Sequence, residues 1–185
     1  HRELLRADQV IDDKRKREAR ENFSEYLREG LIKKQKDDEA KKMYIHNSDI
    51  SLKLSEKMLD DPLKPYLWSI VVSYYSMFYM ANAVLLHLGY KTGRKIVHKV
   101  TSDALIVLVL DKLRKELIEE YENIRDDALE IASMKSEDLL KNYELELEKR
   151  SKFQYSMTLK VQEQMARTSV KRSAEFVLEM KKLLV

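Results

Sequence analysis

Hydrophobic residues recur every three or four positions along most of this chain, which is the period of an amphipathic helix. Between residues 37 and 59 one helical face carries Ala40, Met43, Tyr44, Asn47, Ile50, Leu54 and Met58. The same period predicts further helices over residues 3–29, from Thr101 to about Tyr121, from there to about Met134, and over 157–184. Only 3 Gly and 2 Pro interrupt these patterns. Because strands are usually bounded by such residues, we expect an all-α fold.

The run from Pro65 to Tyr90 contains no Asp, Glu, Lys or Arg, although 36% of the chain is charged. It predicts a helix over about 64–88 that is hidden from water. A membrane span needs roughly 20 apolar residues, so the length allows one. Polar residues and tyrosines are distributed along this run, however, and interfacial aromatic residues gather at the two ends of a span. We therefore expect the middle helix of a bundle, and no membrane.

Several residues mark where these helices begin and end. Gly30 and Gly89 are suited to left-handed helix caps. Asp60-Asp61-Pro62 is expected to stop the second helix, and Pro65 to start the third. The segment 90–99 is a basic connector, after which Thr101 is a predicted N-cap with Asp103 near the positive end of its helix.

Residues 143–157 follow a different pattern. Tyr143, Leu145 and Leu147 alternate with glutamates, and Phe153, Tyr155 and Met157 alternate again. This period is typical of a short β-hairpin, and a helix end followed by a loop is the alternative.

The N-terminal helix carries a dense basic stretch, whose members are Lys14, Arg15, Lys16, Arg17 and Arg20. Two interpretations stay open: a solvated face with i,i+4 pairs, or a patch that contacts phosphate. We divide the chain into a basic helical extension over 1–35 and a helical bundle over 36–185. The net charge of +3 is too small to imply nucleic-acid binding, and the absence of Cys fits the cytoplasm.

No phosphate loop, zinc-protease motif or nucleophile motif occurs in the sequence. The sequence has four histidines, His1, His46, His87 and His98, which lack the spacing of metal ligands, so we expect no metal and no cofactor. His87 is expected to pack or to lie favourably at the negative end of its helix, and His98 to be exposed in the connector. Asn82, deep in the uncharged helix, is expected to join a structural hydrogen-bond network.

Four segments resemble the HEPN family of small helical-bundle proteins, in the family's order and over about residues 37–185. They are YYSMFYMANAVLLHLGYKT (Tyr74–Thr92), HKVTSDAL (His98–Leu105), EKRSKFQY (Glu148–Tyr155) and ARTSVKRSAEFVLEMKKLL (Ala166–Leu184). The likeness is greatest to the uncharacterised archaeal branch. The resemblance implies an up-and-down bundle of four or five helices, a homodimer with a shared site, and a minimal nucleotidyltransferase as one kind of partner.

The ribonucleases of this family use an Arg followed four to six residues later by a His. Arg150 fits the Arg position, but no His follows, and Tyr155, Ser156 and Met157 occupy the positions where the His should fall. A tyrosine with a pKa of about 10 is a poor general base at neutral pH. We therefore expect a HEPN-like module that binds a nucleotide, RNA or a partner protein, with Arg150, Lys152 and His98 as candidate phosphate contacts.

Two alternatives stay open beside this hypothesis. One is a metal-independent, toxin-like ribonuclease that uses Arg150 with Tyr155 or with His98. The other is a structural helical adaptor that binds nucleic acid or protein through its basic N-terminal helix.

Overall fold

A computed structural model describes residues 10–141 and 159–185, with side chains over 10–133 and 159–185. Most of these residues lie in helices: α1 (Asp13–Glu29), α2 (Asp38–Leu59), α3 (Tyr66–His87), α4 (Val97–Leu108), α5 (Lys115–Lys141) and α7 (Leu159–Lys181). Short 3-10 helices follow α4 and α7, at η1 (Leu110–Lys112) and η2 (Lys182–Leu184). Two strands, β1 (Ile32–Lys34) and β2 (Tyr90–Thr92), form a small sheet. The described chain is thus an all-α bundle, as the sequence predicts.

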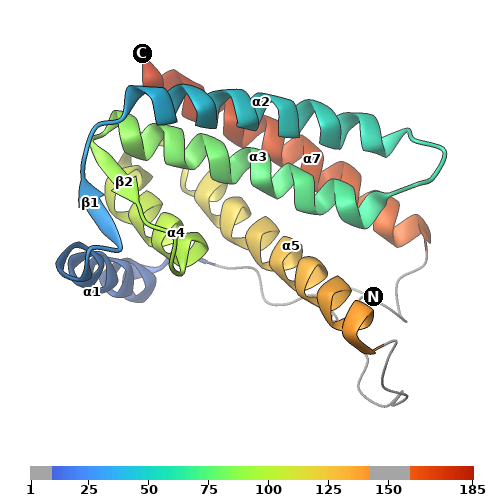
Figure 1. The fold of residues 1–185 in the computed structure, drawn as a ribbon, viewed down its shortest axis with the longest axis horizontal. Coiled ribbons are helices and arrows are strands. Elements are labelled where there is room, and N and C mark those ends of the chain that lie inside the picture. Colours follow the sequence, from blue (N-terminus) through green and yellow to red (C-terminus); the bar gives the residue numbers. More distant parts are fainter. Residues whose placement is uncertain (1–9, 142–158) are drawn as a thin grey trace.

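Helix α3 is the centre of this bundle. It runs beside α2 and α7 and is also contacted by α4 and α5 (Figure 1). By length and composition α3 could cross a membrane, but 83% of its apolar window is buried inside the protein. The uncharged run therefore lies under its neighbours, as predicted for a core helix.

Serines explain how a helix with polar residues can occupy the core. Ser48 on α2 donates a 2.7 Å hydrogen bond to the carbonyl of Ser76 on α3, and Ser69 on α3 donates one of 2.9 Å to the carbonyl of Ser55 on α2. Small side chains let the two helices approach closely, and each hydroxyl finds an acceptor there.

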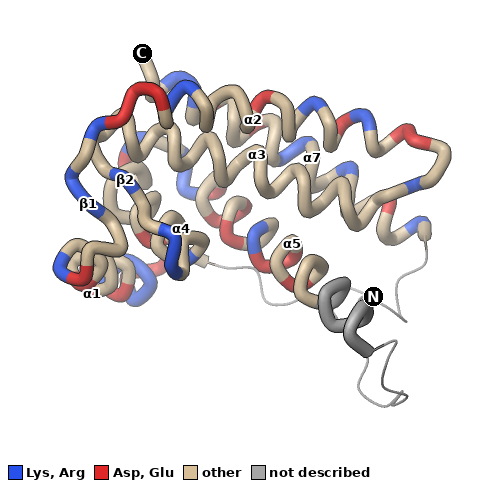
Figure 2. Tube along the Cα trace, in the orientation of Figure 1, with Lys and Arg blue, Asp and Glu red and all other residues tan. Residues whose placement is uncertain are grey.

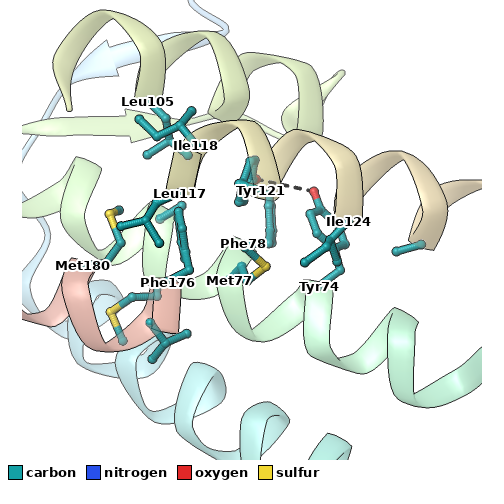
Figure 3. Close-up of a cluster of buried hydrophobic side chains, with 14 of the residues drawn as sticks. Tyr74, Met77, Phe78, Leu105, Leu117, Ile118, Tyr121, Ile124, Phe176 and Met180 are labelled. Carbon is teal, nitrogen blue, oxygen red and sulfur yellow. Dashed lines mark hydrogen bonds between the residues drawn. The ribbon is translucent and has the colours of Figure 1, made fainter. Parts of the chain in front are cut away.

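Large side chains from four helices fill the rest of the core (Figure 3). Tyr121 on α5 stacks on Phe176 of α7, with ring centroids 5.3 Å apart. Its hydroxyl lies 3.5 Å from that of Tyr74 on α3. The core also contains Met77 and Phe78 of α3, Leu105 of α4, Leu117, Ile118 and Ile124 of α5, and Met180 of α7.

The N-terminal segment packs against the bundle through α1 and β1. Phe23 and Tyr26 of α1 are buried in a second cluster with Ile32 of β1 and Val100 of α4. Strand β1 pairs antiparallel with β2, and Ile32 lies opposite Thr92. This sheet was not anticipated, because three-residue strands carry too little periodicity to recognise. The division of the chain near residue 35 stays a prediction.

The structure confirms several predicted helix ends. Gly30 and Gly89 adopt left-handed conformations with φ of 71° and 88°. Asp37 caps α2 through a hydrogen bond from the amide of Ala40, and Pro65 directly precedes α3.

Other predicted boundaries are wrong. Among the described residues α1 begins at Asp13, so residues 10–12 lie outside the helix that was predicted over 3–29. The Asp12 carboxylate caps α1 by accepting a hydrogen bond from the Arg15 amide. Helix α4 begins at Val97, so Thr101 is a buried helical residue and not an N-cap. The helix predicted from Thr101 to about Tyr121 is interrupted after Leu108, and α5, which begins at Lys115, continues through Tyr121 without a break.

The outer face of α2 also differs from the prediction. Met43, Ile50 and Leu54 are exposed, since α3 and α7 cover α2 along a neighbouring stripe that includes Ser48 and Ser55. The predicted hairpin near 143–157 lies outside the described residues.

Candidate functional site

An open cleft of about 530 Å³ lies where α1, α4 and α5 meet. Its lining residues are Arg15 and Glu18 of α1, Ile96, His98, Lys99 and Asp103 at and along α4, and Glu122, Arg125 and Leu129 of α5. Figure 2 shows basic positions on α1 and beside α4 in this part of the molecule. Among the described residues, charged groups of three helices converge on this concave surface.

Two fully buried carboxylates form the floor of the cleft. Asp103 accepts hydrogen bonds from the Asn22 amide (3.0 Å) and the Tyr26 hydroxyl (2.9 Å), both on Oδ2. Its Oδ1 lies 2.7 Å from Arg15 Nη1, in an ion pair that lacks the alignment of a hydrogen bond. Burial and the hydrogen bond to Asp103 raise the pKa of Tyr26, so its hydroxyl stays protonated as the donor.

Glu122 is the second buried carboxylate. Its Oε1 accepts from Arg15 Nη2 at 2.6 Å and from the Ser102 hydroxyl at 2.7 Å. Arg15 therefore bridges the two acids with its two terminal nitrogens. Burial alone would lower the pKa of Arg15, but Glu122 and Asp103 more than offset this and raise it. The guanidinium is fixed as a cation between two anions.

Arg125 is held in the same network. Its Nη1 donates to Ser102 Oγ at 2.6 Å, and its Nε and Nη2 donate to Asp126 Oδ1 at 2.9 and 2.7 Å. Its Nη1 is also 3.5 Å from Glu122 Oε1. Burial opposes the charged form, yet Asp126 and Glu122 raise the pKa of Arg125 overall. Both arginines are thus positioned by acids before any ligand arrives.

His98 lies at the edge of the cleft, half-buried against α3. Its Nδ1 is 2.7 Å from the Tyr74 hydroxyl, and its ring centroid is 4.7 Å from that of Phe78. Burial, and then the charge of Arg125, lower the pKa of His98 below its usual 6.5. The imidazole is therefore neutral at pH 7. Burial also raises the pKa of Tyr74, so this partner keeps its proton.

The N-terminus of α4 opens beside these groups. Its cap residue, Ile96, has a left-handed backbone (φ 42°) and gives no side-chain hydrogen bond to the helix. The first intrahelical bond runs from the amide of Val100 to the carbonyl of Ile96, which leaves the amides of residues 97–99 without an intrahelical acceptor. Arg94, Lys95 and Lys99 are exposed there and make no ion pair with another described residue.

The residues predicted from the sequence have mixed outcomes. His98 does line the cleft, but the expectation that it is exposed is wrong, because α4 begins at Val97 and turns the ring onto Tyr74. Arg15 is not part of a solvated face, whereas Lys14, Arg17 and Arg20 are exposed. Arg150, Lys152 and Tyr155 lie outside the described residues.

The structure also places the other polar residues about which the sequence makes a prediction. His87 is exposed in the last turn of α3, and His46 is exposed on α2. Asn82 does join a network: it donates to the carbonyl of Phe78 and to Thr101 Oγ1, and accepts from Thr92 Oγ1 at 2.6 Å. No cluster of potential metal ligands occurs within the described ranges.

Sequence reasoning missed the acids that organise the cleft. Asp103 had a signal: it is the one charged residue between Val100 and Leu110, in an otherwise apolar helix that must bury it. No sequence pattern indicates that Glu122 and Arg125 are buried, because their segment is charged throughout. Charged pairs at i,i+3 spacing are common on solvated helix faces.

Comparison with protein-family models and with curated proteins finds no match to this chain. The HEPN resemblance therefore rests on the four sequence segments and remains an expectation. The candidate site stands on its geometry alone.

Proposed function

We propose that this chain is a HEPN-like module that binds a nucleotide, free or as part of an RNA strand, in the cleft between α1, α4 and α5. The observation that carries the proposal is the uncapped N-terminus of α4 at the rim of this cleft. Free amides and the positive end of the helix dipole favour a phosphate group at such a position.

The distribution of charged side chains favours binding of a phosphate at the rim of the cleft rather than on its floor. The guanidinium groups of Arg15 and Arg125 are already engaged by Asp103, Glu122 and Asp126. The side chains with spare charge are Arg94, Lys95 and Lys99 around the start of α4. A phosphate there would meet amides and ammonium groups without displacing a buried ion pair.

Calorimetric titration with ADP tests the proposal. Lys95→Ala/Lys99→Ala should weaken ADP binding by about 5-fold, because exposed charge contacts are each worth only a few tenths of a kcal/mol to about 1 kcal/mol. Lys53→Ala/Lys57→Ala removes two exposed lysines of α2 that make no ion pair with another described residue, and is the matched control. Absence of ADP binding by the wild-type chain, or an equal loss in both variants, would count against the site.

A metal-independent ribonuclease is the second candidate, and one observation favours it. His98 is neutral at pH 7 and lies in the cleft with Arg125, so a proton acceptor and a guanidinium share one cavity. General base help typically contributes 10²–10⁴-fold. We nevertheless expect little cleavage, because both arginines are already paired and Tyr155 stands where the family's His belongs.

The two candidates separate in an assay of purified protein on mixed RNA in EDTA. Wild type, His98→Ala and Arg150→Ala are compared. Robust cleavage that is lost in either variant would make the chain a nuclease, and loss in only one of them would identify the group that is used. Tyr155→His is expected to raise a low activity if Arg150 lies within reach of a bound phosphate.

A further inference from the structure

Glu122 has one oxygen that is fully engaged and one that is not. Its Oε1 accepts from Arg15 and Ser102, while Oε2 is buried and has no hydrogen-bond partner in the described part of the protein. The side chain as a whole is only 1% exposed. A buried carboxylate oxygen without a donor is costly, so a group that donates to it would be bound favourably.

The neighbouring side chains direct their donors to other acceptors. Arg15 uses Nη1 for Asp103, Arg125 uses Nε and Nη2 for Asp126, and the Ser102 hydroxyl donates to Oε1. Glu122 lines the cleft, so a molecule that enters it and displaces the atoms covering Oε2 supplies the missing donor.

The position of Glu122 relative to the start of α4 selects the kind of donor. Ser102, which contacts Glu122, lies five residues after Val97, the first residue of α4. Five residues rise about 7.5 Å along a helix. The ribose hydroxyls of a 5′-nucleotide lie a comparable distance from its phosphate. A nucleotide with its phosphate at the start of α4 would thus bring its sugar, rather than its base, to Glu122.

We propose that Glu122 is a specificity-determining residue, whose Oε2 accepts a hydrogen bond from a ribose hydroxyl and makes the cleft selective for ribonucleotides over deoxyribonucleotides. The inference rests on the proposed function, because it places the phosphate at the N-terminus of α4. Arg15 and Arg125 keep the carboxylate neutralised, so Glu122 does not repel the phosphate. A site built to bond a hydroxyl rejects the analogue that lacks it, since its buried acceptor is then left unpaired.

The test compares ADP, 2′-deoxy-ADP and 3′-deoxy-ADP by calorimetric titration of the whole chain. At least one deoxy analogue should bind roughly 10- to 100-fold more weakly than ADP. This is the ratio of dissociation constants expected when one hydrogen bond to a charged acceptor is lost. In Glu122→Gln this ratio should fall, because a hydrogen bond between the sugar hydroxyl and a neutral amide contributes less than one to a charged carboxylate. Glu116→Gln, an exposed position on the same helix, should keep the wild-type ratio.

The outcomes distinguish this inference from the function on which it rests. If ADP binds and both deoxy analogues bind as tightly, Oε2 is hydrated rather than bonded to the sugar, and the inference is overturned while nucleotide binding stands. If ADP does not bind at all, the proposed function itself fails. If Glu122→Gln does not fold, Glu122→Asp, which shortens the acceptor side chain, takes its place; a folded variant at position 122 that keeps the wild-type ratio overturns the assignment to Glu122.

Discussion

Arg15 illustrates how a single side chain acquires a role that its sequence neighbours do not share. It lies within a run of exposed basic residues, yet its guanidinium is 2.7 Å from Asp103 and 2.6 Å from Glu122. Both acids are inaccessible to water, so without Arg15 two carboxylates would be buried with less than their full charge compensation.

Arg15→Met should destabilise the chain by about 3 kcal/mol, because removing one member of a buried ion-pair network leaves its partners uncompensated. The midpoint of urea unfolding at pH 7 measures this. Arg17→Met, at an exposed position two residues away, should change the free energy of unfolding by less than about 0.5 kcal/mol. Equal effects of the two variants would show that the network adds nothing to stability.

His98 predicts a pH dependence of stability. Its pKa is lowered in the folded chain, so the unfolded chain binds a proton more readily below the ordinary value of 6.5. Stability therefore falls as the pH drops through and below 6.5, and gains nothing from this group above it. Unfolding free energies at pH 5.5 and 7.5 should differ less in His98→Asn than in wild type. His46→Asn, at an exposed position on α2, is the matched control, and a pH dependence identical in all three proteins would contradict the prediction.

At the scale of the element, the start of α4 is where local preference and tertiary structure conflict. Ile96 is β-branched and 55% exposed, but it adopts the left-handed conformation that glycine tolerates best. The packing of α4 on α1, α3 and α5 sets where the helix begins, and the chain enters it at the cost of strain at Ile96.

Ile96→Gly should therefore leave the free energy of unfolding unchanged or raise it slightly. Relief of about 1 kcal/mol or more of left-handed strain offsets the similar entropic cost of glycine in the unfolded chain. Lys53→Gly, at an exposed position inside α2, lacks that relief and should lose about 1 kcal/mol. Urea denaturation of both variants is the measurement. A loss at Ile96 as large as that at Lys53 would mean that no strain is released.

At the scale of the whole molecule, the N-terminal segment and the bundle share buried contacts. Tyr26 and Phe23 enter the cluster with Val100, the Ile11 amide donates to Glu119 of α5 at 2.8 Å, and β1 pairs with β2. These contacts link residues before position 35 to three elements after it. Such an arrangement favours unfolding as one unit.

We expect the fluorescence of Trp68, the one tryptophan of the chain, and far-UV circular dichroism to report a single coincident urea transition. Trp68 reports on α3, whereas circular dichroism includes α1. A separate, earlier loss of helical signal would instead indicate that residues 1–35 form an independent extension, as the composition of the sequence suggests.

The homodimer expected from the family resemblance stays a prediction. Light scattering of the whole chain at tens of micromolar should give twice the mass of 22.0 kDa. A monomer under those conditions would also argue against a site shared between two copies of Arg150.

The sequence by itself determined the helical class, the burial of α3 and the caps at Gly30 and Gly89. These features follow from local rules: hydrophobic period, absence of charge, and the backbone freedom of glycine. The structural role of Asn82 was likewise readable, because an amide in an uncharged helix must find partners. The start of α4, the continuity of α5 and the exposure of Met43 could not be predicted from the sequence. Each of them depends on which neighbouring element covers the helix.

The existence and the lining of the cleft were determined only by the tertiary structure. Arg15, Asp103 and Glu122 come from three helices that are far apart in the chain, and nothing in their local patterns says that they meet. Arg15 and Glu122 look like residues of a solvated face, and the apolar surroundings of Asp103 in the sequence indicate burial but not its partner. Ion pairing depends on distance in space, which a one-dimensional period does not encode, and this is why the helices were predictable and their shared site was not.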